Sequence, residues 1–368
     1  MATSAQTQNA EYSPKSWTAE DAYRDKPWIQ YLSHKEHDGF QSALEHALKV
    51  NKPFLEMTQE DYPLPPVSQQ ALRCALATVK GRRGMCLIKG FPTDKWTESE
   101  MRLAYWGIGL YMGVARPQNR AGEVIVDVRD AGGGYKVKGG RGYNTNAGLD
   151  FHQVSVDVVA LLCRRTAETG GASQVVSSIA LRDRVAALRP GLIPVLQANN
   201  WYHSHQGAQD RSQSGYHRCS ILDNDYRFFC ARTNRKNSNA AQEDFPEVPK
   251  YTPEQVEALY LLDRIIPLED YCYTMELERG NIRLLISFVT LHSRTPFEDH
   301  ENPDKKRHLM RLWLSVPGSQ PLPSEWADYW GDVRANAVRG GLCGTAITSE
   351  YLAYEKRQAG AFEMHCTH

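Results

Sequence analysis

The sequence predicts an α+β fold whose core is mainly β, built as a β-sandwich or barrel with helices packed around it. Strand patterns rich in β-branched residues fill the middle and the end of the chain, whereas helical patterns dominate its first third. At 368 residues, the chain fits one large domain as well as two. We expect a disordered tail over residues 1–16 and a single domain over residues 17–368, with helical additions at its N-terminal end.

The helical segments combine apolar residues at helical spacing with a start or stop signal. A glycine ends the first, a capping box opens the second and a proline stops the third. A threonine cap followed by a proline opens the fourth. These segments are residues 68–81, 97–113, 178–191 and 252–266.

The predicted strands are short apolar runs in which β-branched residues are frequent. Within the longest run, Arg279 and Gly280 mark a turn. The runs cover residues 84–91, 123–130, 156–165, 168–178, 271–292 and 307–316, the fourth beginning with a turn.

A glycine-rich loop over residues 131–146 follows one of these strands. It lacks the Gly-Lys-Ser/Thr ending of a phosphate loop, and no helix begins after it, which disfavours a nucleotide site. We interpret the loop as a mobile flap beside a pocket, with an ordinary surface loop as the alternative.

Charge and composition narrow the classes of partner. Lys+Arg and Asp+Glu both number 43, so no global basic field would attract nucleic acid or an anionic membrane. The eight cysteines form no CxxC pair, which suits a reducing compartment and argues against a disulfide framework or a thiolate zinc site. The polar N-terminal segment has no secretory h-region, and no run approaches the length of a membrane span. We therefore expect a cytoplasmic protein.

Two histidines adjoin strand-like runs in a way that suggests a metal site. His152 stands just before an apolar, β-branched run, and His292 ends another such run. Imidazole suits iron, and two histidines with one carboxylate form the iron site of non-haem oxygenases. Arg307 and Arg311, four residues apart on a predicted strand, point to the same face and could clamp an anionic co-substrate. The alternatives are surface or core histidines and surface ion pairs, although an unpaired Arg311 within an apolar strand would be costly.

The chain resembles the taurine dioxygenase-like (TauD/TfdA) group of Fe(II)/2-oxoglutarate oxygenases. The resemblance runs from about residue 85 to residue 325, and several motifs follow one another in the family's order. They are "GLDFH", "DVVALLC", "GGAS", "LHSRTPFEDH", "KKRHLMRLWLS" and "PLP". The resemblance implies a double-stranded β-helix, or jelly roll, with surrounding helices. It also implies oxidation of 2-oxoglutarate by O2 to succinate, coupled to oxidation of a substrate.

The resemblance assigns roles to individual residues. His152 is similar to the proximal iron ligand of the family and His292 to the distal one. Ser173 falls where the family has a hydroxyl that hydrogen-bonds 2-oxoglutarate, and Arg307 is similar to the arginine that pairs with its far carboxylate. Arg311 is similar to a second arginine that lines the catalytic pocket. The implied cofactor is Fe(II), with 2-oxoglutarate as co-substrate and O2 and a small molecule as partners; a homo-oligomer is compatible with this reading.

One position departs from the family pattern. The family has His-x-Asp, whereas this chain has Val154 two residues after His152, so the carboxylate ligand is missing. Where asparagines often precede the distal histidine in the family, this chain has Ile286 and Ser287.

Four explanations of the missing carboxylate remain open. A water, halide or substrate carboxylate could fill the position, as in halogenases of this superfamily. A neighbouring side chain could replace it. An imidazole could come from a distant "HSH" motif, or the protein could be a non-catalytic relative. The residues concerned are Gln153, Asp150 and Asp157 for the second explanation and His203 and His205 for the third.

The remaining site residues all stand at their expected positions, which favours a working site with an atypical two-histidine iron centre. We expect an oxidoreductase acting on a small organic substrate, an amino acid or a secondary metabolite. A jelly-roll partner subunit or binding protein, and halogenase-like or redox-neutral chemistry, are the alternative hypotheses.

Overall fold

The computed structural model describes residues 13–137, 140–205, 215–223, 228–342 and 347–367. Its α-helices are α1 (Ala19–Arg24), α2 (His34–Val50), α3 (Pro66–Lys80), α4 (Glu98–Met112), α5 (Ser178–Leu188), α6 (Leu192–Gln197), α7 (Arg235–Asp244), α8 (Pro253–Ile265), α9 (Ala327–Trp330) and α10 (Ser349–Ala361). Short 3-10 turns are η1 (Phe54–Glu56), η2 (Gly142–Asn144), η3 (Pro303–Lys305) and η4 (Ser324–Trp326).

The strands are β1 (Ile29–Tyr31), β2 (Met85–Lys89), β3 (Val114–Ala115), β4 (Ile125–Val128), β5 (Val158–Arg165), β6 (Thr169–Gly170), β7 (Ser173–Ser177), β8 (Trp201–Ser204), β9 (Tyr216–Cys219), β10 (Tyr273–Met275), β11 (Ile282–Ile286), β12 (Thr290–Arg294), β13 (Phe297–Glu298) and β14 (His308–Ser315). The main sheet has the order β1-β2-β11-β5-β14-β3, and β4 also pairs with β14. A second sheet has the order β10-β7-β12, and the pairs β13-β6 and β8-β9 lie apart from both.

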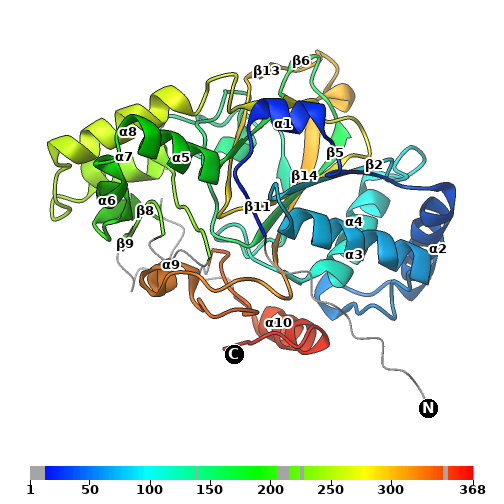
Figure 1. The fold of residues 1–368 in the computed structure, drawn as a ribbon. Coiled ribbons are helices and arrows are strands. Elements are labelled where there is room, and N and C mark those ends of the chain that lie inside the picture. Colours follow the sequence, from blue (N-terminus) through cyan, green and yellow to red (C-terminus); the bar gives the residue numbers. More distant parts are fainter. Residues whose placement is uncertain (1–12, 138–139, 206–214, 224–227, 343–346, 368) are drawn as a thin grey trace.

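The helices cover the two sheets from opposite sides. In Figure 1, α2, α3 and α4 lie together at one side of the central strands, and α5 to α8 lie together at the other. The predicted caps are present: Gly81 ends α3, and capping boxes at Thr97 and Thr252 open α4 and α8. Because these signals act within one turn of helix, the sequence alone could predict them.

Alternation along β7 shows how the layers share the core. Val175 belongs to an apolar cluster that joins the second sheet to β5 and β14 of the main sheet. Val176, the next residue, points to the other face and packs with α5, α6 and α8. A third cluster joins the main sheet to α2, α3, α4 and α10. The two sheets therefore face each other across one buried layer.

The prediction of a single strand in the second half of residues 271–292 is wrong, because this segment forms two strands. A turn at residues 287–289 separates β11, in the main sheet, from β12, in the second sheet. The Thr290 hydroxyl donates to the Ile286 carbonyl at 2.7 Å and closes this turn. As a result, His292 lies within β12 rather than at the end of an extended strand.

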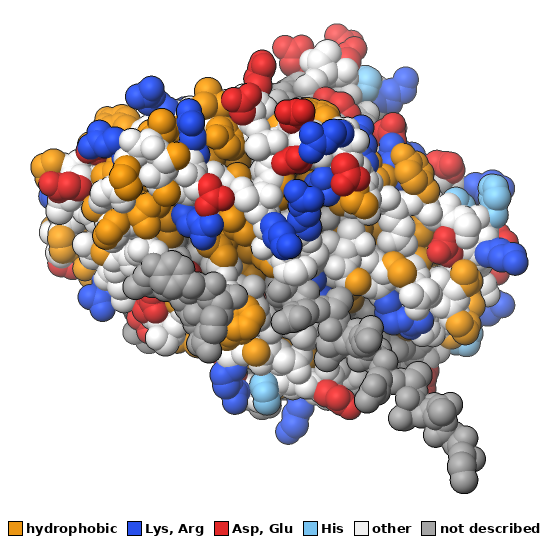
Figure 2. All heavy atoms as spheres, viewed as in Figure 1, with side chains coloured by type: hydrophobic (Ala, Val, Ile, Leu, Met, Phe, Trp, Pro, Cys, Tyr) orange, Lys and Arg blue, Asp and Glu red, His pale blue; other side chains and the backbone are white. Residues whose placement is uncertain are grey.

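The surface shows both signs of charge interspersed on the face seen in Figure 2, with hydrophobic side chains gathered over the part that α5 and α8 occupy. Exposed Leu188, Val256 and Tyr260 belong to these two helices. None of the described helices is both long and apolar enough to cross a membrane. Ser13 and Lys15 donate backbone hydrogen bonds to residues 80 and 82, whereas residues 1–12 of the predicted tail lie outside the described residues.

Candidate active site

His152 and His292 are held side by side by their own backbones. The amide of His152 donates to the carbonyl of His292 at 3.0 Å, and the amide of His292 donates to the carbonyl of His152 at 3.1 Å. Residues paired in this way project their side chains to the same face of a ladder. The two ring centroids are 4.4 Å apart, with an angle of 48° between the ring planes. The fold thus brings together the two histidines predicted as metal ligands.

The hydrogen bond of His152 selects the ring nitrogen that remains available. Its Nδ1 lies 2.8 Å from the carbonyl oxygen of Asp150, which can only accept, so Nδ1 carries the proton and Nε2 carries the lone pair. Burial lowers the pKa of His152 to about 4, and burial beside His152 holds the pKa of His292 well below its usual range. Both imidazoles are therefore neutral at pH 7, which is the state that binds a metal.

A cavity of about 160 Å³ opens beside these two rings. All five residues predicted for the site line it: His152, His292, Ser173, Arg307 and Arg311. They come from the segment before β5, from β7 and β12 of the second sheet, from the residue that precedes β14 and from the middle of β14. The cavity thus lies between the two sheets, where inward side chains of both converge.

Arg307 and Arg311 stack on aromatic rings, and each has a guanidinium nitrogen without a hydrogen-bond partner among the described residues. Arg307 lies over the ring of Phe297, with 4.9 Å between the guanidinium carbon and the ring centroid. Arg311 donates from Nε to the amide oxygen of Gln118 at 2.6 Å and lies 4.9 Å from the ring centroid of Trp313. Nη1 of Arg307 and Nη2 of Arg311 are buried without a hydrogen-bond partner among the described residues.

The cavity is also lined by two arginines that the sequence analysis did not single out, Arg283 and Arg294. Arg283, on β11, donates to the hydroxyl of Ser173, and Arg294, on β12, donates to backbone carbonyls of the glycine-rich loop region. Each keeps two buried guanidinium nitrogens without a partner in the described part of the chain. For Arg283 the signal was an arginine inside an apolar strand, "IRLLI", the same signal that drew attention to Arg311, whereas Arg294 ends a polar stretch that carries no such signal.

The wall of the cavity is strongly cationic. Burial, together with the charge of Arg307, lowers the pKa of Arg283 and of Arg294 to about 9. These values lie above 7, so both side chains stay charged at neutral pH. Among the described lining residues none is Asp or Glu, and the cationic ones are Arg141, Arg232, Lys236, Arg283, Arg294, Arg307 and Arg311. Such a wall is suited to a ligand with several negative charges.

Val154 lines the same cavity and supplies no ligand atom. The neighbours considered as replacements are engaged elsewhere. The amide oxygen of Gln153 accepts from the Thr233 amide at 2.7 Å, and the carboxylate of Asp157 is paired with Arg339 at 2.7 Å, with both side chains fully buried. Asp150 is exposed and does not line the cavity, and its carboxylate contacts the Tyr135 hydroxyl at 3.4 Å.

The "HSH" motif divides between two environments. His205 lines the cavity, on the side that Arg232 and Tyr329 form, and its Nδ1 has no partner among the described residues. His203 points elsewhere, toward Cys219. His205 is thus the member of the motif that could approach a ligand in the cavity.

The glycine-rich loop forms part of the cavity wall, as its interpretation as a flap requires. Tyr135, Gly140, Arg141, Gly142 and Tyr143 all line the cavity, and residues 138–139 lie outside the described residues. The position beside a pocket is therefore confirmed, while the mobility of the loop stays a prediction.

The comparison with protein families identifies the class to which this fold and cavity belong. The chain belongs to the taurine catabolism dioxygenase TauD, TfdA family, whose model matches residues 51–313. The FR-33289 synthase of Streptomyces rubellomurinus is 28% identical over 305 residues, covering 78% of this chain and 86% of that protein.

Two solved structures share the fold. Asparagine oxygenase AsnO has a TM-score of 0.61 at 16% identity, over 81% of this chain and 97% of that chain. The non-haem iron oxygenase OrfP, solved with Fe and alpha-ketoglutaric acid, has a TM-score of 0.56 at 14% identity, over 78% and 94%. The predicted double-stranded β-helix with surrounding helices is confirmed by these likenesses.

Proposed function

We propose that the protein is an Fe(II)/2-oxoglutarate-dependent oxidoreductase that acts on a small organic acid, such as an amino acid or a secondary metabolite. The observation that carries this proposal is the pair of neutral imidazoles beside a cavity whose guanidinium groups lack acidic partners among the described residues. The family and the Fe-bound and alpha-ketoglutarate-bound structures of OrfP support it.

The residues present fit the iron. Nε2 of His152 is left available by the bond from Nδ1 to a carbonyl, and His292 is held beside it by two backbone hydrogen bonds. Imidazole nitrogens are suitable ligands for Fe(II). The donor set is smaller than a two-histidine, one-carboxylate triad, so an additional coordination position stays open to water, an anion or a substrate group.

The residues present also fit 2-oxoglutarate. Its two carboxylates require charged donors, and Arg307, Arg283 and Arg311 each offer a buried guanidinium nitrogen without a partner in the described chain. Arg283 also donates to the Ser173 hydroxyl, which fixes the position of that oxygen at the cavity wall. Without an anion, these buried charges would be unpaired at considerable cost.

When bound, the iron and 2-oxoglutarate supply an O2-dependent oxidant, with conversion of the co-substrate to succinate and carbon dioxide. The protein's own contribution is positional. Arg307 and Ser173 orient the co-substrate, the histidine pair fixes the metal, and the apolar residues Val159, Leu309 and Trp313 line the cavity and limit the access of water.

The cationic wall indicates the class of substrate. Two carboxylates of 2-oxoglutarate would pair with only part of the positive charge around the cavity. Arg141, Arg232 and Lys236 lie on the same wall, where Lys236 lies 4.7 Å from the ring centroid of Tyr135 and Arg232 lies 5.1 Å from that of Tyr329. We infer that the substrate carries at least one acidic group, which these residues recognise.

Val154 favours a second candidate function at the same site. A position without a carboxylate can accept a halide, so halogenation is the alternative outcome, although valine leaves less room than a smaller residue would. A partner subunit without catalysis is less well supported, because buried unpaired arginines would then serve no ligand.

The proposal is tested by adding Fe(II) and then 2-oxoglutarate to the isolated chain without oxygen and following the absorbance of the iron complex. Formation of succinate after admission of O2 is then measured with a panel of organic acids, each paired with its methyl ester. We expect binding of both ligands and greater succinate formation with the free acids. Failure to bind either Fe(II) or 2-oxoglutarate would overturn the proposal.

A further inference from the structure

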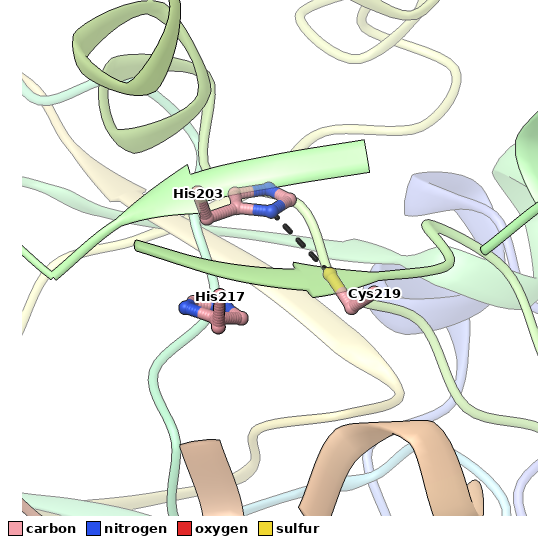
Figure 3. Close-up of side chains that lie close together, drawn as sticks. All are labelled: His203, His217 and Cys219. Carbon is pink, nitrogen blue, oxygen red and sulfur yellow. Dashed lines mark hydrogen bonds between the residues drawn. The ribbon is translucent and has the colours of Figure 1, made fainter. Parts of the chain in front are cut away.

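The β8–β9 hairpin carries a second cluster of metal-binding side chains, apart from the histidine pair of the active site. His203 on β8 is directly opposite His217 on β9. Cys219 follows His217 by two residues, and alternation along a strand therefore places it on the same face. Figure 3 shows the three side chains close together on the hairpin, with a hydrogen bond between His203 and Cys219. One ligand atom from each residue lies within 4.8 Å of the others.

Most ring nitrogens of this cluster have no hydrogen-bond partner among the described residues, which is unusual for buried polar atoms. Both ring nitrogens of His217 and Nε2 of His203 are buried with no hydrogen-bond partner in the described part of the chain. Among the described residues, the remaining nitrogen of His203 has the Cys219 sulfur as its partner, 3.3 Å away. All three side chains are buried. Buried polar groups are nearly always satisfied, so a group of unsatisfied nitrogens around one thiol indicates a missing ligand.

We propose that His203, His217 and Cys219 bind a thiophilic d10 cation, zinc(II) or copper(I), within the β8–β9 hairpin. Imidazole and thiolate are the ligands that these ions prefer, and a thiolate selects them over Fe(II). On binding, the thiol proton of Cys219 leaves to solvent and the sulfur forms a bond to the metal, so one proton is released for each cation bound; the net charge of the site then rises by one with zinc(II) and is unchanged with copper(I). With zinc(II), which prefers four ligands, a water would complete the coordination; with copper(I), the three protein ligands would suffice.

The surroundings are compatible with this cation. The positive side chain that lines the cavity on this side is Arg232, which lies over the ring of Tyr329. Tyr329 stacks on His217 with ring centroids 4.0 Å apart, and the Arg232 guanidinium lies over Tyr329. The thiolate of Cys219 offsets part of the remaining repulsion.

The cluster is separate from the proposed iron site but adjoins the same wall. None of His203, His217 and Cys219 lines the active-site cavity, whereas His205, Arg232 and Tyr329 do. A two-stranded hairpin is marginally stable by itself, and a metal bound to both of its strands would hold that wall in place. The role we assign to the metal is therefore structural, and it does not depend on the proposed function.

The sequence pattern predicted no thiolate zinc site, since the cysteines form no CxxC pair. The hairpin shows why spacing was not informative. The ligands meet across the strands, through the pairing of residues 203 and 217, rather than along one segment.

The experiment uses the full chain carrying His152→Ala and His292→Ala, so that the proposed iron site cannot contribute. Metal-free protein is dialysed under reducing conditions against zinc(II) in one arm and copper(I) in the other. Cobalt(II) is used in a third arm, because its absorption bands report thiolate coordination. We expect one equivalent of metal per chain and a cobalt–thiolate band. Loss of a ligand should weaken binding by more than about 100-fold, since even outer-shell partners contribute roughly 10–100-fold.

Cys219→Ser and His217→Asn are the test variants, and Cys86→Ser is the matched control, because Cys86 is equally buried but lies on β2 of the main sheet. Binding must be lost in both test variants and kept in the control. Circular dichroism establishes that each variant is folded, and His217→Asn decides if Cys219→Ser does not fold. The proposal is overturned if the background chain binds neither zinc(II) nor copper(I), or if the thiolate band survives in Cys219→Ser.

Discussion

Ser287 binds both backbone polar groups of Val154. Its hydroxyl accepts from the Val154 amide at 2.9 Å and donates to the Val154 carbonyl at 2.5 Å. The position that lacks the carboxylate is therefore fixed to the turn between β11 and β12, close to His292. Ser287 is itself a departure from the family pattern, and its hydroxyl fixes the backbone of Val154, the other departure.

This relationship makes Val154→Asp a direct test of the missing ligand. Because the backbone is held in place and aspartate is close to valine in size, the new carboxylate should face the cavity beside the histidines. We expect Fe(II) to bind about 10-fold more tightly or better, which corresponds to roughly 1.4 kcal/mol. We also expect an altered product or faster uncoupled consumption of 2-oxoglutarate.

Anaerobic Fe(II) titration of Val154→Asp, Val154→Asn and the natural chain separates the charge from the shape of the new side chain. Asparagine has the same shape without the charge, so it should change the affinity little. Equal iron affinity in all three proteins would mean that residue 154 does not reach the metal, or that another group already occupies the position.

The histidine pair should be essential for metal binding and dispensable for the fold. His152→Ala or His292→Ala removes one of two protein ligands, so each should abolish stoichiometric Fe(II) binding while the circular dichroism spectrum is retained. His205→Ala is the matched control, because His205 also lines the cavity. Loss of iron in His205→Ala would instead identify a third imidazole ligand, and unchanged iron in both ligand variants would refute the assignment.

Arg307 should act on 2-oxoglutarate much more than on iron. Truncation of one member of a buried charged pair costs roughly 2–5 kcal/mol, so Arg307→Ala should weaken 2-oxoglutarate by that amount. The affinity for Fe(II) alone should change little, and Arg307→Lys should recover part of the loss, since it restores charge without the planar fork. Isothermal titration of both ligands checks this. If 2-oxoglutarate binds Arg307→Ala normally, Arg311→Ala is the next variant to examine.

Asp127 should contribute stability that is lost in acid. Burial raises the pKa of Asp127, but the hydrogen bond from His308 and the charge of Arg102 outweigh it and lower that pKa to about 2, from 3.8. Since the folded pKa is the lower one, the stabilisation is complete above pH 3.8 and disappears as the pH falls through 2. It amounts to about 2 kcal/mol at pH 7, of which about half is lost by pH 3.

Urea unfolding of Asp127→Asn at pH 7 and pH 3 measures this contribution. The variant should be less stable than the natural chain at pH 7, and the difference should shrink in acid. Asp94→Asn serves as the control, because the Asp94 side chain is 91% exposed and its ion pair contributes little. A difference that is independent of pH would indicate a packing effect instead of the charge of Asp127.

Sequence reasoning succeeded where the signal was local or carried by a motif. The caps at Thr97 and Thr252 act within one turn of helix and are present. His152, His292 and Arg307, which stand in motifs of the resemblance, line one cavity, while their roles as ligands stay predictions. It failed where the pairing of distant segments decides the outcome. The turn after Ile286 depends on which sheet each half of the run joins, and an apolar run does not record that choice.

The cationic wall was predicted only in part for the same reason. Arg311 was recognised because it stands inside an apolar strand, yet Arg283 stands inside one as well and was passed over. That Arg283 points at Ser173 follows from the arrangement of β11 and β7 in two facing sheets. No spacing along the chain predicts this contact.

The backbone bridge between His152 and His292 also has a consequence for the order of events during synthesis. The two residues lie far apart along the chain, and the entropy of closing so long a loop must be overcome before the bridge can form. A nascent chain that ends before β12 cannot assemble the pair, however well its first half has folded. Acquisition of iron should therefore be a late step, and the iron content of a preparation would report the fraction of chains in which the two sheets have closed on each other.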